Sequence, residues 1–210
     1  YPNQDQKALT KSTVKLNDQV IKTIDSTTPY VGFIGAGNYA SRTLIPAFKE
    51  AGAVLDTLVT SGGISGVHHG NKNQFVTAST KTEDLWGNDK INTVSIVTRH
   101  DAHAQQVIDA LNSGKNVFVE KPLALTLDEL DKINKSYNKA NSSSTVRLMV
   151  GFNRRYAPHV VKMRKLLDSH HSPKSIIMTI NAGAIPGEHW VQDSSIGGGR
   201  IIGEGCHFID

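Results

Sequence analysis

Short apolar runs alternate with longer segments of mixed polarity from residue 30 to about residue 152. Each run is rich in Val, Ile, Leu or Phe, which favours a strand over a helix. The expected strands occupy residues 31–34, 54–60, 75–77, 91–98, 117–119 and 148–152. Because most of these runs are nearly continuously apolar, they indicate a parallel sheet that is covered on both faces.

Helical segments are expected between these strands, at residues 38–51, at residues 83–86, between Asp101 and Gly114, and after Thr126. Asp101 and Thr126 are expected to cap their helices, and Gly114 to end the helix before it. Pro46 lies inside the first helical segment and has no N–H to donate, so we expect a kink or a loosened turn there. This alternation of strands and helices predicts an α/β fold.

A glycine-rich turn follows the first predicted strand and has the spacing G-x-G-x-x-A, with Gly35, Gly37 and Ala40 at the fixed positions. Gly35 allows a sharp turn, Gly37 allows a pyrophosphate to approach the backbone, and Ala40 allows close packing of the helix on the strand. Asn38 and Tyr39 lie at the start of that helix, where free N–H groups favour phosphate. The spacing also fits an ordinary tight turn, but its place in a strand–helix array favours a doubly wound Rossmann sheet that binds a dinucleotide.

The segments outside this array have a different pattern. Residues 1–29 are polar and show no convincing period, so we interpret them as a leader or an inter-domain linker, followed by a Rossmann domain at residues 30–152. Residues 153–210 offer a basic amphipathic helix at 157–167, one strand at 175–180, a loop and a last helical segment. A lone strand needs partners, so we interpret this part as the truncated start of an α/β substrate domain, completed by further sequence or by a second copy in a homo-oligomer.

Composition excludes several other classes of protein. The formal charge of +4 comes from scattered Lys and Arg residues, which disfavours nucleic-acid binding. Apolar runs fall short of the roughly 20 residues that a membrane span needs, and the N-terminal residues lack the apolar core of a signal peptide. The single cysteine, Cys206, excludes an internal disulfide and fits a reducing cytoplasm. Adjacent histidine pairs lack the spacing of metal ligands, so no metal site is expected.

Four segments together resemble the glucose–fructose oxidoreductase / inositol dehydrogenase / MocA family of NAD(P)-dependent oxidoreductases. These are the glycine turn, Glu-Lys-Pro-Leu-Ala-Leu-Thr, Gly-Phe-Asn-Arg-Arg-Tyr-Ala-Pro and the C-terminal glycine triplet with its helix, at residues 32–40, 120–126, 151–158 and 197–210. The chain is most similar to the second half of bi-domain oxidoreductases, in which a covalent zinc-type alcohol dehydrogenase module comes first. The resemblance implies a carbohydrate substrate and NAD or NADP as cofactor.

Lys121 and His207 are the expected catalytic residues. Lys121 follows a predicted buried strand at the sheet edge where ligands bind, and its ammonium could polarise a sugar hydroxyl or carbonyl. The resemblance assigns the matching lysine this role and makes a cis bond to Pro122 plausible. His207 matches the family's acid/base histidine, and imidazole suits proton transfer. The alternatives are an ordinary surface lysine and a structural core histidine.

Substrate contacts are predicted from the residues that flank these two. Many relatives carry an aspartate four residues before the histidine, whereas this chain has Gly203 followed by Glu204. One residue turns a helical side chain by about 100°, so Glu204 does not simply replace that aspartate. Arg154 could bind a carboxylate or phosphate of the substrate, with Tyr156 close by, but a solvated or inter-domain ion pair explains the arginine equally well.

Cofactor contacts are expected at the ends of the strands. They comprise Thr98, Arg99, His100 and His103 after the 91–98 strand, and Glu120 with Lys121 after the 117–119 strand. For NAD against NADP, the end of the second strand matters. Asp56 is inside that apolar run rather than at its end, and Ser61, which is at the end, could serve either cofactor.

The resulting hypothesis is an NAD(P)-dependent dehydrogenase that moves hydride to or from a secondary alcohol of a sugar, with this fragment alone expected to be inactive. The alternatives are a non-catalytic dinucleotide-binding sensor and a docking module of a larger bi-domain protein. Retention of Lys121 and His207 argues for catalysis, and Gly203 argues mildly for a sensor.

Overall fold

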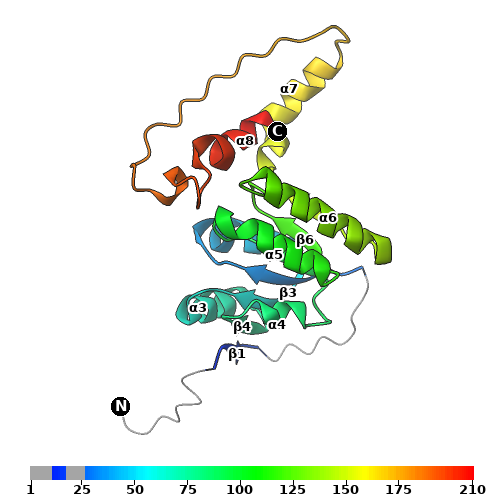
Figure 1. The fold of residues 1–210 in the computed structure, drawn as a ribbon, viewed down its shortest axis with the longest axis vertical. Helices are drawn as coiled ribbons and strands as arrows, with labels where there is room; N and C mark the ends of the chain where they lie inside the picture. The colour runs from blue at the N-terminus through cyan, green and yellow to red at the C-terminus, as the bar shows by residue number, and fades with distance from the viewer. Residues whose placement is uncertain (1–10, 18–26) are drawn as a thin grey trace.

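A seven-stranded sheet organises the molecule (Figure 1). The computed structural model describes residues 11–17 and 27–210. The strand order is β1-β4-β3-β2-β5-β6-β7, and every neighbouring pair is parallel except β1 with β4. The strands are β1 (Thr13–Lys15), β2 (Tyr30–Ile34), β3 (Val54–Val59), β4 (Thr77–Ser79), β5 (Thr93–Ile96), β6 (Asn116–Val119) and β7 (Leu148–Val150).

The strand order confirms the doubly wound Rossmann fold. From β2 the chain proceeds outward to β3 and β4, then crosses back to β5 and continues to β6 and β7 on the other side. The switch in direction therefore falls between β2 and β5, and ligands of open α/β sheets bind outside the carboxyl ends of the strands at such a point. The helical elements are η1 (Ala40–Leu44), α2 (Ile45–Glu50), α3 (Gly63–Asn73), α4 (Glu83–Trp86), α5 (His100–Asn112), α6 (Leu127–Ser143), η2 (Asn153–Tyr156), α7 (Pro158–Asp168), η3 (Trp190–Gln192), η4 (Ile201–Gly205) and α8 (Cys206–Ile209).

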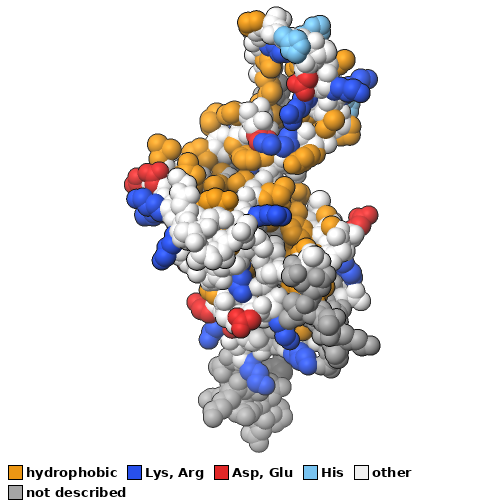
Figure 2. Space-filling model, turned by 90° about the vertical axis from the view of Figure 1, so that its right-hand side faces the viewer, with side chains coloured by type: hydrophobic (Ala, Val, Ile, Leu, Met, Phe, Trp, Pro, Cys, Tyr) orange, Lys and Arg blue, Asp and Glu red, His pale blue; other side chains and the backbone are white. Residues whose placement is uncertain are grey.

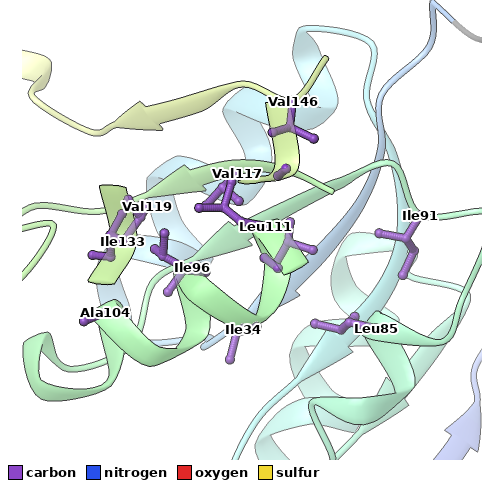
Figure 3. Close-up of a cluster of buried hydrophobic side chains, with 14 of the residues drawn as sticks. Ile34, Leu85, Ile91, Ile96, Ala104, Leu111, Val117, Val119, Ile133 and Val146 are labelled. Atoms are coloured by element: carbon purple, nitrogen blue, oxygen red, sulfur yellow. The ribbon is translucent and has the colours of Figure 1, made fainter. Parts of the chain in front are cut away.

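Each face of the sheet has its own core. On one face α5 and α6 cover β5 and β6, and Figure 3 shows Leu111 and Ile133 packed with Ile96 and Val119. On the other face, aromatic rings from β2, α2, β6 and Phe75, which precedes β4, meet edge to face, at centroid distances of 5.2 to 5.9 Å. The strands are nearly continuously apolar because both faces are covered.

The edge strand β1 comes from a segment that the sequence pattern assigns to a linker. Thr13–Lys15 pairs antiparallel with β4, and Leu16 packs onto α3, where a Cβ on Gly70 would lie 2.3 Å from it. Backbone pairing along the open side of β4 therefore fixes a segment whose side chains are mostly exposed. The rest of the predicted linker, residues 1–10 and 18–26, lies outside the described residues, and the division of the chain at residue 152 stays a prediction.

Local signals are mostly confirmed. Thr126 and Glu129 form a reciprocal capping box at the start of α6, and Gly114 adopts φ +69° after α5. The turn before Pro46 is widened into the π-helical η1, because proline cannot donate to the carbonyl four residues back. Asp101 is not the cap of α5: the helix begins at His100, and Asp101 lies in its first turn.

Two expected strands differ from the structure. The strand predicted at 75–77 is β4, which begins at Thr77, because the Phe75 side chain is fully buried in the core just before the strand. Residues 175–180 do not form a strand: they are exposed and extended, since no neighbouring strand supplies backbone partners. Their apolar side chains lie on the surface, as do those of α7, and the C-terminal elements lie beyond the sheet (Figures 1 and 2).

Within the described part of the chain, no helix is long and apolar enough to cross a membrane. The C-terminal residues return to the carboxyl edge of the sheet, where the amide of Asp101 donates to the carbonyl of Ile196 at 3.1 Å. This return brings Trp190 and His207 next to the glycine turn.

Candidate functional site

The glycine turn has the geometry that its spacing predicts. Gly35 has φ +102°, and a Cβ there would lie 2.5 Å from the carbonyl oxygen of Val97. Gly37 is exposed, and a Cβ on it would meet nothing within 4 Å. Ala40 is buried to 1% exposure. Gly35 thus lets β2 and β5 close together, while Gly37 leaves open space over the first helical turn, whose N–H groups have no intrahelical partners.

A cleft of about 420 Å³ opens beside this turn. It is formed by the glycine turn, the ends of β5 and β6, and residues that return from the C-terminal segment. The residues around it are Gly37, Asn38, Tyr39, Ala40, Val97, Thr98, His100, His103, Glu120, Lys121, Asn153, Trp190 and His207. A cavity of about 600 Å³ near β1 and α4 lies at residues with no predicted chemistry. The smaller cleft contains most of the predicted cofactor residues and both predicted catalytic residues.

Lys121 extends from the end of β6 into the cleft. Its Nζ donates to the backbone carbonyl of Gly203 at 2.7 Å, which ties β6 to η4. The Lys121–Pro122 bond is cis, and the carbonyl of Pro122 accepts a hydrogen bond from Nδ1 of His103 at 2.7 Å. The hydrogen bond to Gly203 holds the ammonium at the same edge of the sheet as the glycine turn.

His207 reaches the cleft from α8. Its pKa is lowered to about 4, first by burial and then by the positive charges of Lys121 and Arg154. Its Nδ1 is buried and has no hydrogen-bond partner among the described residues. The imidazole is therefore neutral near pH 7, and its Nδ1 is available for a hydrogen bond.

Glu120 contributes a second buried polar atom. Its Oε1 has no hydrogen-bond partner within the described residues, and Gly151 leaves room for it, since a Cβ there would lie 2.7 Å from that oxygen. Burial raises the pKa of the carboxyl group, and Lys121 opposes this shift. A ligand hydroxyl would satisfy this oxygen, which fits the predicted contact with a ribose.

The turn after β5 and the start of α5 supply four more predicted residues. Thr98 donates from Oγ1 to Gln106 at 2.8 Å, and its carbonyl lies 3.2 Å from Nε2 of His103. Arg99 is exposed and does not face the cleft, but its guanidinium lies 5.9 Å from the ring centre of Trp190. His100 and His103 are buried at the cleft, and burial is the main cause that lowers the pKa of each.

Gly203 leaves no space for a larger residue. A Cβ there would lie 2.9 Å from the carbonyl oxygen of Gly197 and 3.1 Å from Cε1 of His100. The carboxylate of Glu204 is bound by Arg200 at 3.0 Å instead of facing the cleft. The structure thus separates Glu204 from the cleft, in keeping with the difference of about 100° per residue along a helix.

The other predicted substrate residues are outside the cleft. The guanidinium of Arg154 lies over the ring of Phe208 at 4.2 Å, and Tyr156 is 65% exposed. Arg155 forms an ion pair with Asp210. Asn153, which precedes them, does reach the cleft and donates to the Tyr39 hydroxyl at 3.1 Å.

The end of β3 bears on the choice between NAD and NADP. Ser61 is exposed just beyond β3 and outside the cleft residues. Asp56 is buried and accepts hydrogen bonds from Thr57 at 2.7 Å and Asn88 at 2.9 Å, which leaves it a structural role inside the fold. Asp56 also lies where the pairing register between β2 and β3 shifts, between the Val31–Leu55 and Phe33–Leu58 pairs.

Trp190 is a cleft residue that the sequence patterns do not indicate. It lies in a loop-like stretch far along the chain, and its ring meets that of His100 edge to face at 4.9 Å. The only sequence feature that could have indicated a site residue here is an aromatic side chain in a loop that contains Gly and Pro. The contacts of Trp190 become clear only because the structure shows this loop returning to the sheet.

The cleft residues fit a dinucleotide. Gly37 leaves an open cradle over a helix start, and buried oxygen and nitrogen atoms of Glu120 and His207 lack partners within the described residues. Together with the strand order, these features define a dinucleotide-binding Rossmann protein. The chain belongs to the Gfo/Idh/MocA oxidoreductase family with an NAD-binding Rossmann fold, whose family model matches residues 30–152.

Known proteins agree with this assignment. The chain is 33% identical over 140 residues to Oxidoreductase P35 of Formosa agariphila, covering 66% of this chain and 42% of that protein. It is 32% identical over 150 residues to inositol 2-dehydrogenase/D-chiro-inositol 3-dehydrogenase of Lactiplantibacillus plantarum, covering 70% and 41% respectively. The fold is similar to that of levoglucosan dehydrogenase in complex with NADH and levoglucosan, with a TM-score of 0.70 and 22% identity over 86% of this chain and 52% of that one. The match thus spans about two fifths of the length of each of these two curated relatives.

Proposed function

We propose that the chain carries the cofactor half of an NAD(P)-dependent dehydrogenase acting on a secondary alcohol of a sugar or cyclic polyol. The observation that carries this proposal is the convergence of Lys121, His207 and the glycine turn on one cleft at the switch point of the sheet. The names of the inositol and levoglucosan dehydrogenases support a polyhydroxylated substrate.

The two side chains have complementary tasks in this reaction. A bound nicotinamide cofactor would supply the hydride acceptor for the carbinol carbon, and the hydride donor for the carbonyl carbon in the reverse direction. The Lys121 ammonium donates a hydrogen bond to the substrate oxygen and stabilises the negative charge that develops there. In this proposal His207 takes the hydroxyl proton in the oxidation and returns it in the reduction. Its pKa of about 4 in this structure makes it a weak base near pH 7, so the role requires the bound substrate oxygen to raise that pKa.

Calorimetry with NAD and NADP comes first, because cofactor binding is common to the dehydrogenase and to a sensor. Failure of the folded protein to bind either cofactor would exclude both. Absorbance at the reduced-nicotinamide band with myo-inositol, D-chiro-inositol and levoglucosan then tests for turnover. Binding without turnover of these or other sugars, in the chain and in any longer protein that contains it, favours the sensor.

Lys121→Ala tests the mechanism directly. We expect turnover to fall by at least a thousandfold while NADH affinity changes by less than about threefold, because Nζ acts on the substrate oxygen. Lys132→Ala, on the exposed side of α6, is the matched control and should leave both quantities unchanged. Turnover that survives in Lys121→Ala would show that another group stabilises the alkoxide.

A further inference from the structure

His100 is a buried imidazole that has one nitrogen engaged and one nitrogen available. The side chain is 8% exposed and forms part of the cleft wall. Its Nδ1 lies 2.8 Å from the carbonyl oxygen of Gly197. Its Nε2 takes no hydrogen bond within the described residues and is not sealed from solvent.

This geometry fixes the tautomer. A carbonyl oxygen can only accept a hydrogen bond, so Nδ1 of His100 must carry the hydrogen. In a neutral ring Nε2 then presents a lone pair. Burial lowers the pKa of His100, with smaller contributions in the same direction from the charges of His103 and Lys121, against the Gly197 carbonyl and Asp101. The ring therefore offers an acceptor to the cleft at neutral pH.

The ring is also held in place from several sides. Trp190 packs against it edge to face at 4.9 Å, and Gly203 lies so close that an added Cβ would be 3.1 Å from Cε1. The backbone on both sides of Gly197 is anchored, because Asp101 N donates to the Ile196 carbonyl and Gly198 N donates to the Asp193 carbonyl, each at 3.1 Å. A ligand thus meets an acceptor that is already oriented, which lowers the ordering cost of binding.

Neighbouring contacts associate His100 with the reacting end of the cleft. Gly197, Gly203 and Trp190, all in the C-terminal segment, contact it. Its ring centre also lies 5.7 Å from that of His103 in α5. The carbonyl of Gly203 holds Lys121, the residue proposed to bind the reacting oxygen. An acceptor in this position complements a hydroxyl group and is left unpaired by a ligand that lacks one.

We propose that His100 determines substrate specificity: its Nε2 accepts a hydrogen bond from a carbohydrate hydroxyl next to the one that Lys121 binds. This inference rests on the proposed dehydrogenase function and assigns His100 to the substrate, in place of the cofactor contact that its position in the sequence suggests.

The test removes Nε2 while keeping the engaged nitrogen. In His100→Asn the side-chain amide can still donate to Gly197, but nothing stands where Nε2 was. We expect KM for the most rapidly oxidised of myo-inositol, D-chiro-inositol and levoglucosan to rise about tenfold, with the NADH dissociation constant within twofold of the original. His68→Asn, an exposed histidine of α3, should change neither value.

A deoxy analogue identifies the hydroxyl. The analogue that lacks the hydroxyl next to the oxidised carbon should have an about tenfold lower kcat/KM than the parent sugar with the unmodified protein, and an equal kcat/KM with His100→Asn. A weakened NADH affinity with unchanged KM would make His100 a cofactor ligand and overturn the inference. If neither KM nor the NADH dissociation constant changes in a His100→Asn variant with the original Tm, His100 contributes only to packing and the inference is overturned.

Nitrogen NMR of histidine-labelled protein keeps the inference testable if turnover is absent. The resonance pair that disappears in His100→Asn should show a protonated Nδ1 and an unprotonated Nε2. With NADH present, one of the three sugars should shift that Nε2 resonance. A protonated Nε2, or no shift with any of the three sugars at saturating concentration, would overturn the inference. Absence of turnover in the longer proteins that contain this chain would refute only the dehydrogenase function.

Discussion

Alanine at Gly35 and at Gly37 should have opposite consequences, although the two glycines are two residues apart in one turn. Gly35 has φ +102° and closely approaches the backbone of Val97, whereas Gly37 lies outside the left-handed region and faces open space. We therefore expect Gly35→Ala to destabilise the fold and Gly37→Ala to weaken cofactor binding.

The size of the first effect follows from the structure. A left-handed conformation costs an alanine about 1–2 kcal/mol. The new Cβ would lie 2.5 Å from the Val97 carbonyl oxygen, and relieving such a contact by backbone shifts costs about 1–3 kcal/mol. The sum is about 3 kcal/mol, or a fall in Tm of roughly 6–12 °C for a chain of this size.

Gly37→Ala acts on the ligand instead. A glycine-to-alanine change at an allowed φ stabilises a fold by about 0.4–1 kcal/mol, through the unfolded state, so stability should be equal or slightly higher. The methyl group occupies the space through which a pyrophosphate approaches the backbone, so the NADH dissociation constant should rise at least about tenfold.

Urea unfolding followed by circular dichroism measures the first effect, and calorimetry with NADH measures the second. Equal stability of Gly35→Ala and the original protein, within about 1 kcal/mol, would refute the argument from the Val97 contact. Unchanged NADH affinity in Gly37→Ala would mean that the pyrophosphate does not approach this residue.

Two further predictions concern charge. His207 has a pKa of about 4 in the fold against 6.5 normally, so the unfolded chain binds more protons between these values: its contribution to stability is complete above pH 6.5 and is lost as the pH falls through 4. His207→Gln should therefore flatten the dependence of the unfolding midpoint on pH in that window, and an unchanged dependence would contradict the shift. Ser61→Asp places a carboxylate at the end of β3, and the ratio of NADP to NAD dissociation constants should rise at least about tenfold in calorimetry; an unchanged ratio would place the adenosine ribose elsewhere.

Most of the Rossmann domain was predictable because its signals are local. Apolar runs indicated most of the strands, and the spacing of Gly35, Gly37 and Ala40 indicated the turn. The boundaries that moved depend on tertiary contacts: Phe75 leaves the predicted strand because its ring fills the core beside Phe33. The edge strand β1 was missed because backbone pairing with β4, rather than an apolar pattern, fixes it.

The candidate site was predictable where a residue ends a strand and unpredictable where a loop returns. Lys121, Glu120 and His103 are at the cleft because the carboxyl ends of parallel strands share one edge. Trp190 reaches the cleft only because the loop that contains it returns to the sheet, and no local sequence pattern indicates that return. Glu204 and Arg154 are close in sequence to residues that reach the cleft, but their own side chains do not face it. Arg200 binds the carboxylate of Glu204, and the guanidinium of Arg154 packs on Phe208.

The acceptor for Lys121 is a backbone atom, and this affects how the site can change in evolution. A side-chain partner can be removed by one substitution, but the carbonyl of Gly203 persists whatever residue occupies the position. His100 and the Gly197 carbonyl occupy the space that a side chain at position 203 would need. The size of residue 203 is therefore restricted by steric contact, and not by its hydrogen bond to Lys121. A larger residue at position 203 therefore requires the Gly197 carbonyl to move as well as a change at His100, so lineages that carry a carboxylate there should differ both in the backbone at residue 197 and in the side chain at the position of His100.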